Sequence, residues 1–274
     1  MQHKNRERKF KLHPYTQEII NQYKDGISTI KLAEKYNVHV SSICKLLERN
    51  GVERKHVSSS CYYIDENFFE KIDSEQKAYI LGFIFADGCI VECKYTNVLR
   101  IVLAEKDYLH LEKIRDIVAP TYNINTSDSC KKHFNCQTAF IFSVGNNKIC
   151  SDLMTHGCTP RKSLTLTFPT TVPDNLIHHF IRGYFDGDGC VCTWNKKTYF
   201  SLLGTYEFLK SIQNIFERFL NVNKNSILVY PRSKAHTIYY GAKKDIRSIR
   251  EYFYHDATIY LQRKYDSFFK NEKI

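Results

Sequence analysis

The chain has 274 residues, of which 43% are hydrophobic and 14% aromatic, enough for one large domain or two medium ones with an appendage. This composition excludes a disordered chain, and the lack of any run of about 18 apolar residues excludes a membrane-spanning helix. The net charge of +11 favours a polyanionic partner, and it is concentrated at the ends: residues 1–60 carry 12 Lys and Arg against 6 Asp and Glu, and residues 222–274 carry 11 against 5.

The N-terminal residues 1–9 are charged and no apolar stretch follows them, so no secretory signal is predicted. The ten cysteines lack the spacing of a zinc knuckle, and Cys44, Cys89 and Cys150 lie within apolar patterns, where Cys acts as a small hydrophobic residue. We therefore expect reduced thiols in an intracellular protein of a bacterial or phage-infected cytoplasm or of an organelle.

Residues 1–13 form a basic arm, and three short helical patterns follow it. The first begins near Thr16, a candidate N-cap, Ser28 caps the second, and the third begins near Ser41. Asn37 lies at the turn between the second and third, where Asn is suitable because it tolerates a positive φ. Apolar residues stand at the core positions Leu32, Ala33, Tyr36, Val38, Ile43 and Leu46.

This segment resembles a helix-turn-helix, which implies that residues 1–51 are a small all-α DNA-binding domain. Its third helix would enter a major groove and present Ser41, Ser42 and Lys45. An ordinary helical hairpin is the alternative. Residues 52–73 have no sustained period and are predicted to be a linker that lies along DNA or along the core.

One short phrase occurs twice, at residues 80–89 and 181–190. Each copy keeps a Gly at its third place and ends in Asp-Gly-Cys, and we predict an apolar helix that stops at Asp-Gly, with the final glycine in the left-handed cap conformation. The mid-helix glycines, Gly82 and Gly183, each weaken a helix by ~1 kcal/mol relative to Ala. They therefore favour two helices that approach backbone to backbone.

If these helices pack together, Asp87 and Asp188 meet at the same end. Two carboxylates at the negative ends of helix dipoles repel and resist ionisation, and a divalent cation between them removes the conflict. Oxygen ligands suit Mg²⁺, and open positions for water and phosphate suit metal-assisted cleavage of a phosphodiester. One copy alone would indicate an Asp-Gly turn after a buried helix, whereas two copies in matching context favour the metal site.

The two copies resemble the LAGLIDADG motif of homing endonucleases in its single-chain, two-repeat form, over nine positions. The first copy departs by carrying Phe85 where the second has Asp186, but both terminal acids are present. The resemblance implies two or more Mg²⁺ ions, with Mn²⁺ able to replace them. The implied metal ligands are Asp87, Asp188 and the backbone carbonyls of Ala86 and Gly187.

The two halves stay in step after each Asp-Gly. Strand patterns at 98–104 and 139–144 in the first half correspond to 199–204 and 237–241 in the second, and the helical patterns lie at 109–118, 147–156, 208–220 and 243–253. The resemblance covers roughly residues 65–270 and implies an α+β fold. We expect two pseudo-symmetric αββαββα repeats with saddle-shaped antiparallel sheets, over residues 74–168 and 169–274.

Each half then reaches a basic pair, Arg161-Lys162 or Arg263-Lys264, at 75 residues from Asp87 to Lys162 and 76 from Asp188 to Lys264. By the same resemblance, Lys162 and Lys264 match pocket lysines that orient solvent and offset charge on the phosphate. The arginines could share or take this role, and a surface lysine is the alternative for each.

Base reading is expected from side chains that face outward on the strands. The candidates are Lys94, Asn97, Arg100, Lys131, Lys132, Gln137, Lys196, Lys197, Arg232, Lys234 and His236, together with Arg161 and Arg263. His178 and His179 are interpreted as packing or surface residues rather than metal ligands, and Trp194 as either core or DNA-stacking.

The leading hypothesis is a monomeric, Mg²⁺-dependent double-strand endonuclease of a mobile element, which leaves short 3′ overhangs and recognises a long asymmetric DNA site. Two alternatives stay open: a DNA-binding transcription regulator that has lost cleavage, and an RNA maturase that assists intron splicing. Both would use the same fold, and maturase activity could coexist with cleavage.

Overall fold

The computed structural model describes residues 12–52, 63–127, 138–195, 197–222, 227–229 and 235–269. The chain divides into two compact units, Met1–Cys61 and Tyr62–Ile274. Within the described ranges, no helix has the length and apolar character that a membrane crossing requires.

The N-terminal unit consists of short helices around a small apolar core. They are η1 (His13–Tyr15), α2 (Thr16–Lys24), α3 (Thr29–Lys35) and α4 (Val40–Arg49). Ser28 caps α3 as predicted, since its hydroxyl accepts a hydrogen bond from the Lys31 N–H, and Asn37 has a φ of 47°. Thr16 differs from the expectation: it is the first residue of α2, and its hydroxyl donates to the His13 carbonyl. Leu47 is the buried leucine of α4, whereas Leu46 is only half-buried.

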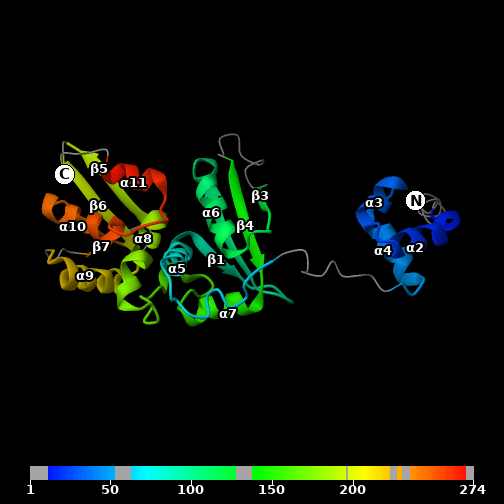
Figure 1. Cartoon of the computed structure of the whole chain (residues 1–274), viewed down its shortest axis with the longest axis horizontal. Helices are drawn as coiled ribbons and strands as arrows, with labels where there is room; N and C mark the ends of the chain where they lie inside the picture. Colours follow the sequence, from blue (N-terminus) through cyan, green and yellow to red (C-terminus); the bar gives the residue numbers. More distant parts are fainter. Residues whose placement is uncertain are drawn as a thin grey trace. The chain divides into compact units, whose positions relative to one another are not determined.

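The second unit contains the same order of elements twice (Figure 1). The first copy is α5 (Glu75–Asp87), β1 (Gly88–Val91), β2 (Val98–Ala104), α6 (Tyr108–Val118), β3 (Ile124–Thr126), β4 (Ala139–Gly145) and α7 (Asn147–Thr155). The second is α8 (Ile177–Asp188), β5 (Gly189–Trp194), β6 (Lys197–Gly204), α9 (Tyr206–Leu220), β7 (Ile227–Val229), β8 (His236–Tyr240) and α10 (Lys243–Tyr254). The predicted αββαββα order is therefore present in both halves. The helix α11 (Gln262–Phe269), which follows, was not predicted.

The strands of each copy form a four-stranded antiparallel sheet, in the order β1-β2-β4-β3 and β5-β6-β8-β7. Helices α6 and α7 pack against one face of the first sheet, and α9 and α10 against one face of the second (Figure 1). Successive side chains point to opposite faces, so every second residue of β2, such as Leu99 and Ile101, is buried under helices. The residues between them are exposed or half-buried, which leaves the other face of each sheet open.

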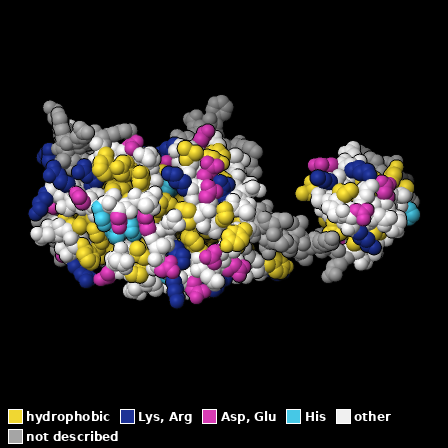
Figure 2. Space-filling view, viewed as in Figure 1, with side chains coloured by type: hydrophobic (Ala, Val, Ile, Leu, Met, Phe, Trp, Pro, Cys, Tyr) yellow, Lys and Arg dark blue, Asp and Glu magenta, His cyan; other side chains and the backbone are white. Residues whose placement is uncertain are grey.

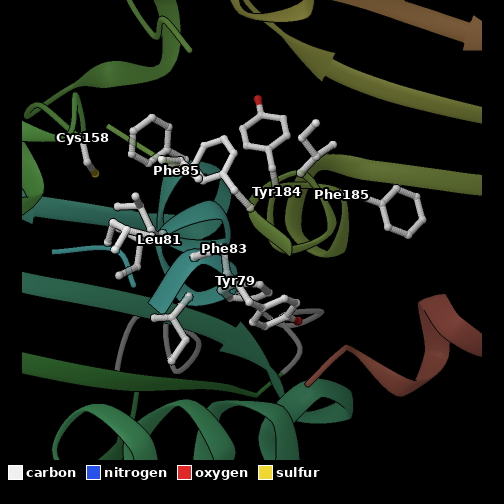
Figure 3. Packing of buried hydrophobic residues seen from close by; sticks show 14 of the residues in the cluster. Tyr79, Leu81, Phe83, Phe85, Cys158, Tyr184 and Phe185 are labelled. Carbon is white, nitrogen blue, oxygen red and sulfur yellow. The ribbon is translucent and has the colours of Figure 1, made fainter. Parts of the chain in front are cut away.

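Helices α5 and α8 pack together in the middle of this unit, with their glycines at the contact. A Cβ added to Gly82 would lie 1.9 Å from the Phe180 carbonyl oxygen, and one added to Gly183 would lie 2.0 Å from the Tyr79 carbonyl oxygen. The backbones therefore touch where the sequence has no side chain. Phe83 and Phe85 leave α5 here, while Phe185 points away from α5 into the second half (Figure 3).

The glycines that end these helices are not in the expected left-handed conformation. Gly88 has φ −87° and ψ 157°, and Gly189 has φ −97° and ψ 166°, because each helix passes directly into an extended strand. Glycine is required here for space. A Cβ on Gly88 would lie 2.7 Å from the Ile84 side chain, and one on Gly189 would lie 2.2 Å from Phe185.

The predicted linker over residues 52–73 extends too far towards the C-terminus. Phe68, Phe69 and Ile72 are buried in the core of the second unit, and the Phe69 carbonyl is 2.6 Å from His156 Nε2. The compact unit therefore begins at Tyr62. The first part of the linker and most of the basic arm lie outside the described residues.

Candidate active site

The two terminal acids lie at the ends of the packed helices, where α5 and α8 pass into β1 and β5. A Cβ added to Gly187 would lie 2.4 Å from the Ala86 Cβ and 3.1 Å from the Asp87 Oδ2. The end of α8 therefore lies directly against the end of α5. Asp87 is exposed and Asp188 is half-buried, so both carboxylates can be reached from solvent.

The electrostatic conflict expected between these acids is present. Although Asp87 reaches solvent, the dense protein around it limits its hydration, and this burial together with the charge of Asp188 raises the pKa of Asp87 to about 6. Burial also raises the pKa of Asp188, while the positive charges of Lys162 and Lys264 lower it. A divalent cation would relieve this conflict, and carboxylate oxygens are donors that Mg²⁺ prefers.

The two predicted lysines flank the acids in matching positions. Lys162 and Lys264 are both buried, at 7% and 8% exposure. The Lys162 ammonium donates to the Gly88 carbonyl, and the Lys264 ammonium donates to the Gly189 carbonyl. Burial, and then the charge of Arg263, lower the pKa of Lys264. Each lysine therefore binds the carbonyl of the glycine that directly follows one of the two acids. The similar sequence separations predicted matching positions but not these contacts.

Under the hypothesis that the acids form a DNA-cleaving centre, replacing Lys264 by Met should reduce cleavage by about 10²-fold at unchanged DNA affinity, because one positive charge beside the phosphate would be lost. Cleavage rate and gel-shift affinity measured on one target would check this. Lys148→Met is the matched control, since Lys148 pairs with Glu70 and Asp152 away from the acids. Equal rates for Lys264→Met and Lys148→Met would remove Lys264 from the active site.

The arginines of the two basic pairs have different surroundings. Arg161 is exposed and has a left-handed backbone, with φ 58°. Arg263 forms two parallel hydrogen bonds with the buried Asp107, Nε to Oδ1 at 2.7 Å and Nη2 to Oδ2 at 2.8 Å. This ion pair joins α11 to the start of α6 and so links the two halves. It also occupies the Arg263 guanidinium, which was predicted to contact DNA.

The exchange of Phe85 for Asp186 between the two motif copies has a structural explanation. Phe85 packs edge-on against Phe180, with ring centroids 5.1 Å apart. At the corresponding place, Asp186 accepts a hydrogen bond of 2.6 Å from the Tyr79 hydroxyl. Phe85 thus faces Phe180, whose ring has no hydroxyl, whereas Asp186 faces Tyr79, whose ring has one. Asp186 also accepts from the Leu261 N–H at 2.7 Å, which fixes the chain just before α11 and Lys264.

A second buried network holds the segment that leads into α11. Arg182 is fully buried and donates to the carbonyls of Phe253 and Ile259, at 2.6 and 3.1 Å. It also donates to Glu75 Oε1 at 2.6 Å, and Glu75 in turn accepts from the Thr258 N–H and hydroxyl. Glu75 begins α5 in the first half, so the first half positions the chain that carries Lys264. No local pattern indicates this pairing of residues 107 positions apart.

Glu75→Gln should lower the free energy of unfolding by about 3 kcal/mol at pH 7, because it leaves the buried Arg182 charge uncompensated. Burial alone would raise the pKa of Glu75, but the Thr258 hydrogen bonds and the Arg182 charge lower it below its ordinary 4.5. The ionised carboxylate therefore stabilises the fold above pH about 4.5, and this contribution is lost as pH falls through the lowered pKa. Urea unfolding should show the gap between variant and wild type closing below that pH, with the exposed Glu70→Gln as control.

His178 and His179 are buried and meet Asp256. His178 Nε2 is 3.1 Å from Asp256 Oδ1, and His179 Nε2 is 3.6 Å from Oδ2. Within the described residues this is the one group of three with metal-ligand spacing. However, Arg182 donates to His179 Nδ1 at 2.8 Å. The neutral ring therefore carries its proton on Nε2 and has no lone pair to offer there, which favours the packing role. Histidine and acidic side chains lie together on the viewed face of this half (Figure 2).

The other predicted contacts are placed only in part. Lys94 and Lys197 are exposed, and Asn97, Arg100 and His236 are half-buried. Trp194 is 68% exposed at the end of β5, so it is not a core residue. In the N-terminal unit Ser41 and Lys45 are exposed and Ser42 is half-buried. The predictions for Lys131, Lys132, Gln137, Lys196, Arg232 and Lys234 lie outside the described residues.

No family model matches the chain, and no curated protein matches it. Solved structures do. The homing endonuclease I-WcaI bound to its DNA recognition sequence is 15% identical, over 73% of this chain and 91% of that one, with a TM-score of 0.51. The LAGLIDADG homing endonuclease I-GzeII in complex with its DNA target is 16% identical over 72% and 88%, with a TM-score of 0.47. I-SmaMI bound to uncleaved DNA in the presence of calcium ions is 13% identical over 72% and 89%, with a TM-score of 0.47.

Proposed function

We propose that this chain, which has the LAGLIDADG homing endonuclease fold, is a site-specific endonuclease of double-stranded DNA that acts as a monomer. The observation that carries the proposal is the pair of acids at the ends of two helices in backbone contact, each flanked by a buried lysine. I-WcaI, a homing endonuclease with this fold, is bound to its DNA recognition sequence. The basic charge of +11 supports a DNA partner.

The carboxylates of Asp87 and Asp188 would hold two or more Mg²⁺ ions, or Mn²⁺ in their place, with the carbonyls of Ala86 and Gly187 as auxiliary ligands. When bound, such ions supply a water of lowered pKa and neutralise charge on the phosphate and the departing oxygen. Lys162 and Lys264 add a fixed positive charge on each side of the acids. One lysine for each half suits the cutting of two strands, and we expect short 3′ overhangs.

The open faces of the two sheets would read the DNA. Their residues differ between the halves, so the site should be long and asymmetric. The N-terminal unit would extend the footprint through α4, whose Ser41, Ser42 and Lys45 would contact the major groove.

Cleavage of a randomised DNA library tests the proposal. With Mg²⁺ or Mn²⁺ the full chain should enrich cuts at one long site, and with EDTA it should give none. Tight, specific binding without cutting would replace the nuclease by a transcription regulator. Protection of intron RNA that persists after both acids are changed to Asn would favour a maturase.

A further inference from the structure

The open faces of the two sheets carry matched apolar patches, and we infer that these patches bind the C5-methyl groups of thymines in the major groove of the target. The inference rests on the proposed function, because it names what the sheets read in a DNA site. The open faces continue from the acids: Cys89 and Cys190, two residues after Asp87 and Asp188, are exposed at the starts of β1 and β5.

In the first sheet the patch lies where β2 pairs with β4. Val102 is 41% exposed on the open face, and its cross-strand partner is Ile141, which is half-buried on the same face. Cross-strand partners in an antiparallel pair point to the same side, so the two side chains form one apolar surface. The exposed Asn125, which pairs with Ile141 on its other side, borders it. No helix packs over this surface within the described residues.

The second sheet has a related arrangement, in which the buried Thr237, at 4% exposure, stands between two exposed leucines. Leu203 is 38% exposed in β6, and its partner in β8 is Thr237. Thr237 pairs on its other side with Leu228 of β7, which is 51% exposed. The Thr237 hydroxyl donates to the Leu202 carbonyl at 3.0 Å, so this hydroxyl already has a hydrogen-bond partner within the protein.

The two patches occupy equivalent places in the two halves. Val102 lies 15 residues after Asp87, and Leu203 lies 15 residues after Asp188. Since the strand order and the acid positions are also repeated, both patches should meet the same position of their half-sites. Because the fold is repeated, the same strand position is exposed in both halves, and in both it holds an aliphatic residue.

The chemistry of the major groove selects the ligand. Each base pair presents hydrogen-bond donors and acceptors there, and the thymine C5-methyl is the apolar group of unmodified DNA. An aliphatic patch pressed on guanine or cytosine would leave their polar edges without partners, which costs affinity. Among the strand residues that the structure describes, the cations on the open faces are Arg100 and Lys197. Arg100 therefore stands as a candidate reader of guanine beside the apolar pair Val102 and Ile141.

The test begins with the site selected from the library, bound by the full chain in Ca²⁺. We expect thymine at one equivalent position in each half-site. Replacing those thymines by uracil, which lacks only the methyl, should weaken binding about fourfold per methyl. Val102→Ser should remove the difference between thymine and uracil in the first half-site, and Leu203→Ser should remove it in the second.

Leu109→Ser is the control, because Leu109 is 72% exposed but lies on α6, which covers the other face of the sheet. It should keep the full preference for thymine. Guanine or cytosine selected at both of these positions would overturn the inference. A selected site that is insensitive to every C5-methyl would overturn the inference and leave the endonuclease intact, whereas the lack of any selected site would overturn the endonuclease itself.

Discussion

Changing Asp87 or Asp188 to Asn should reduce DNA cleavage by about 10³-fold or more while DNA affinity is kept. The proposed divalent cation supplies several kcal/mol of transition-state stabilisation, and it would lose a charged ligand. In the proposed mechanism both carboxylates serve one metal centre, so each single change should have nearly the full effect and the double change should add little. Single-turnover cleavage of the selected site, with gel-shift affinity in Ca²⁺, measures the two quantities separately.

The same variants carry a second signature that does not depend on catalysis. In EDTA the two acids repel, so Asp87→Asn should raise the melting temperature by about 2–4 °C. Added Mg²⁺ should stabilise the wild type and close this gap. Asp174→Asn is the control, since Asp174 is exposed and pairs with Arg218 away from the site. Retained cleavage in either active-site variant would show that the acids do not share a metal centre.

The repeated architecture could be predicted from the sequence because it depends on local patterns, namely hydrophobic periodicity and the repeated motif. Periodicity predicts β2 at Val98–Ala104 with the bounds that the structure has, and the glycines of the motif predict a close helix pair. The missed element is α11, a helix of eight residues that has no place in the predicted αββαββα order. Gly88 and Gly189 were assigned the wrong conformation because sequence alone does not show that a strand follows each helix without a turn.

The contacts that position the site lay beyond sequence reasoning for a different reason. Glu75 and Arg182 meet only because α5 and α8 cross, and nothing local to either residue indicates the other. The same holds for Tyr79 and Asp186. The departure of the first motif copy at Phe85 is one half of a pair whose other member, Phe180, lacks a hydroxyl. Such compensation becomes visible only when both helices are placed.

The helix contact itself gives the largest expected effect on stability. In Gly183→Ala the new Cβ would stand 2.0 Å from the Tyr79 carbonyl oxygen and 2.9 Å from the Phe83 nitrogen. Both are backbone atoms that no rotamer change can move, so α5 and α8 must separate. We expect the free energy of unfolding to fall by about 3 kcal/mol or more, which lowers the melting temperature by roughly 6–12 °C. Thermal unfolding of the full chain measures it, and Gly82→Ala should behave alike.

Cleavage should respond to this change even where the variant is folded. Asp87 and Asp188 end the two helices, so a shift that separates them misplaces the proposed metal ligands, and a 1 Å error can cost about 10²-fold in rate. Gly145→Ala is the matched control, because its Cβ would meet only the Thr96 and Val98 side chains at 3.7 and 4.0 Å. A Gly183→Ala protein that unfolds earlier but cleaves at the wild-type rate below its transition would separate the helix contact from the chemistry. Loss of both together would show that the missing side chains of Gly82 and Gly183 set the distance between the acids.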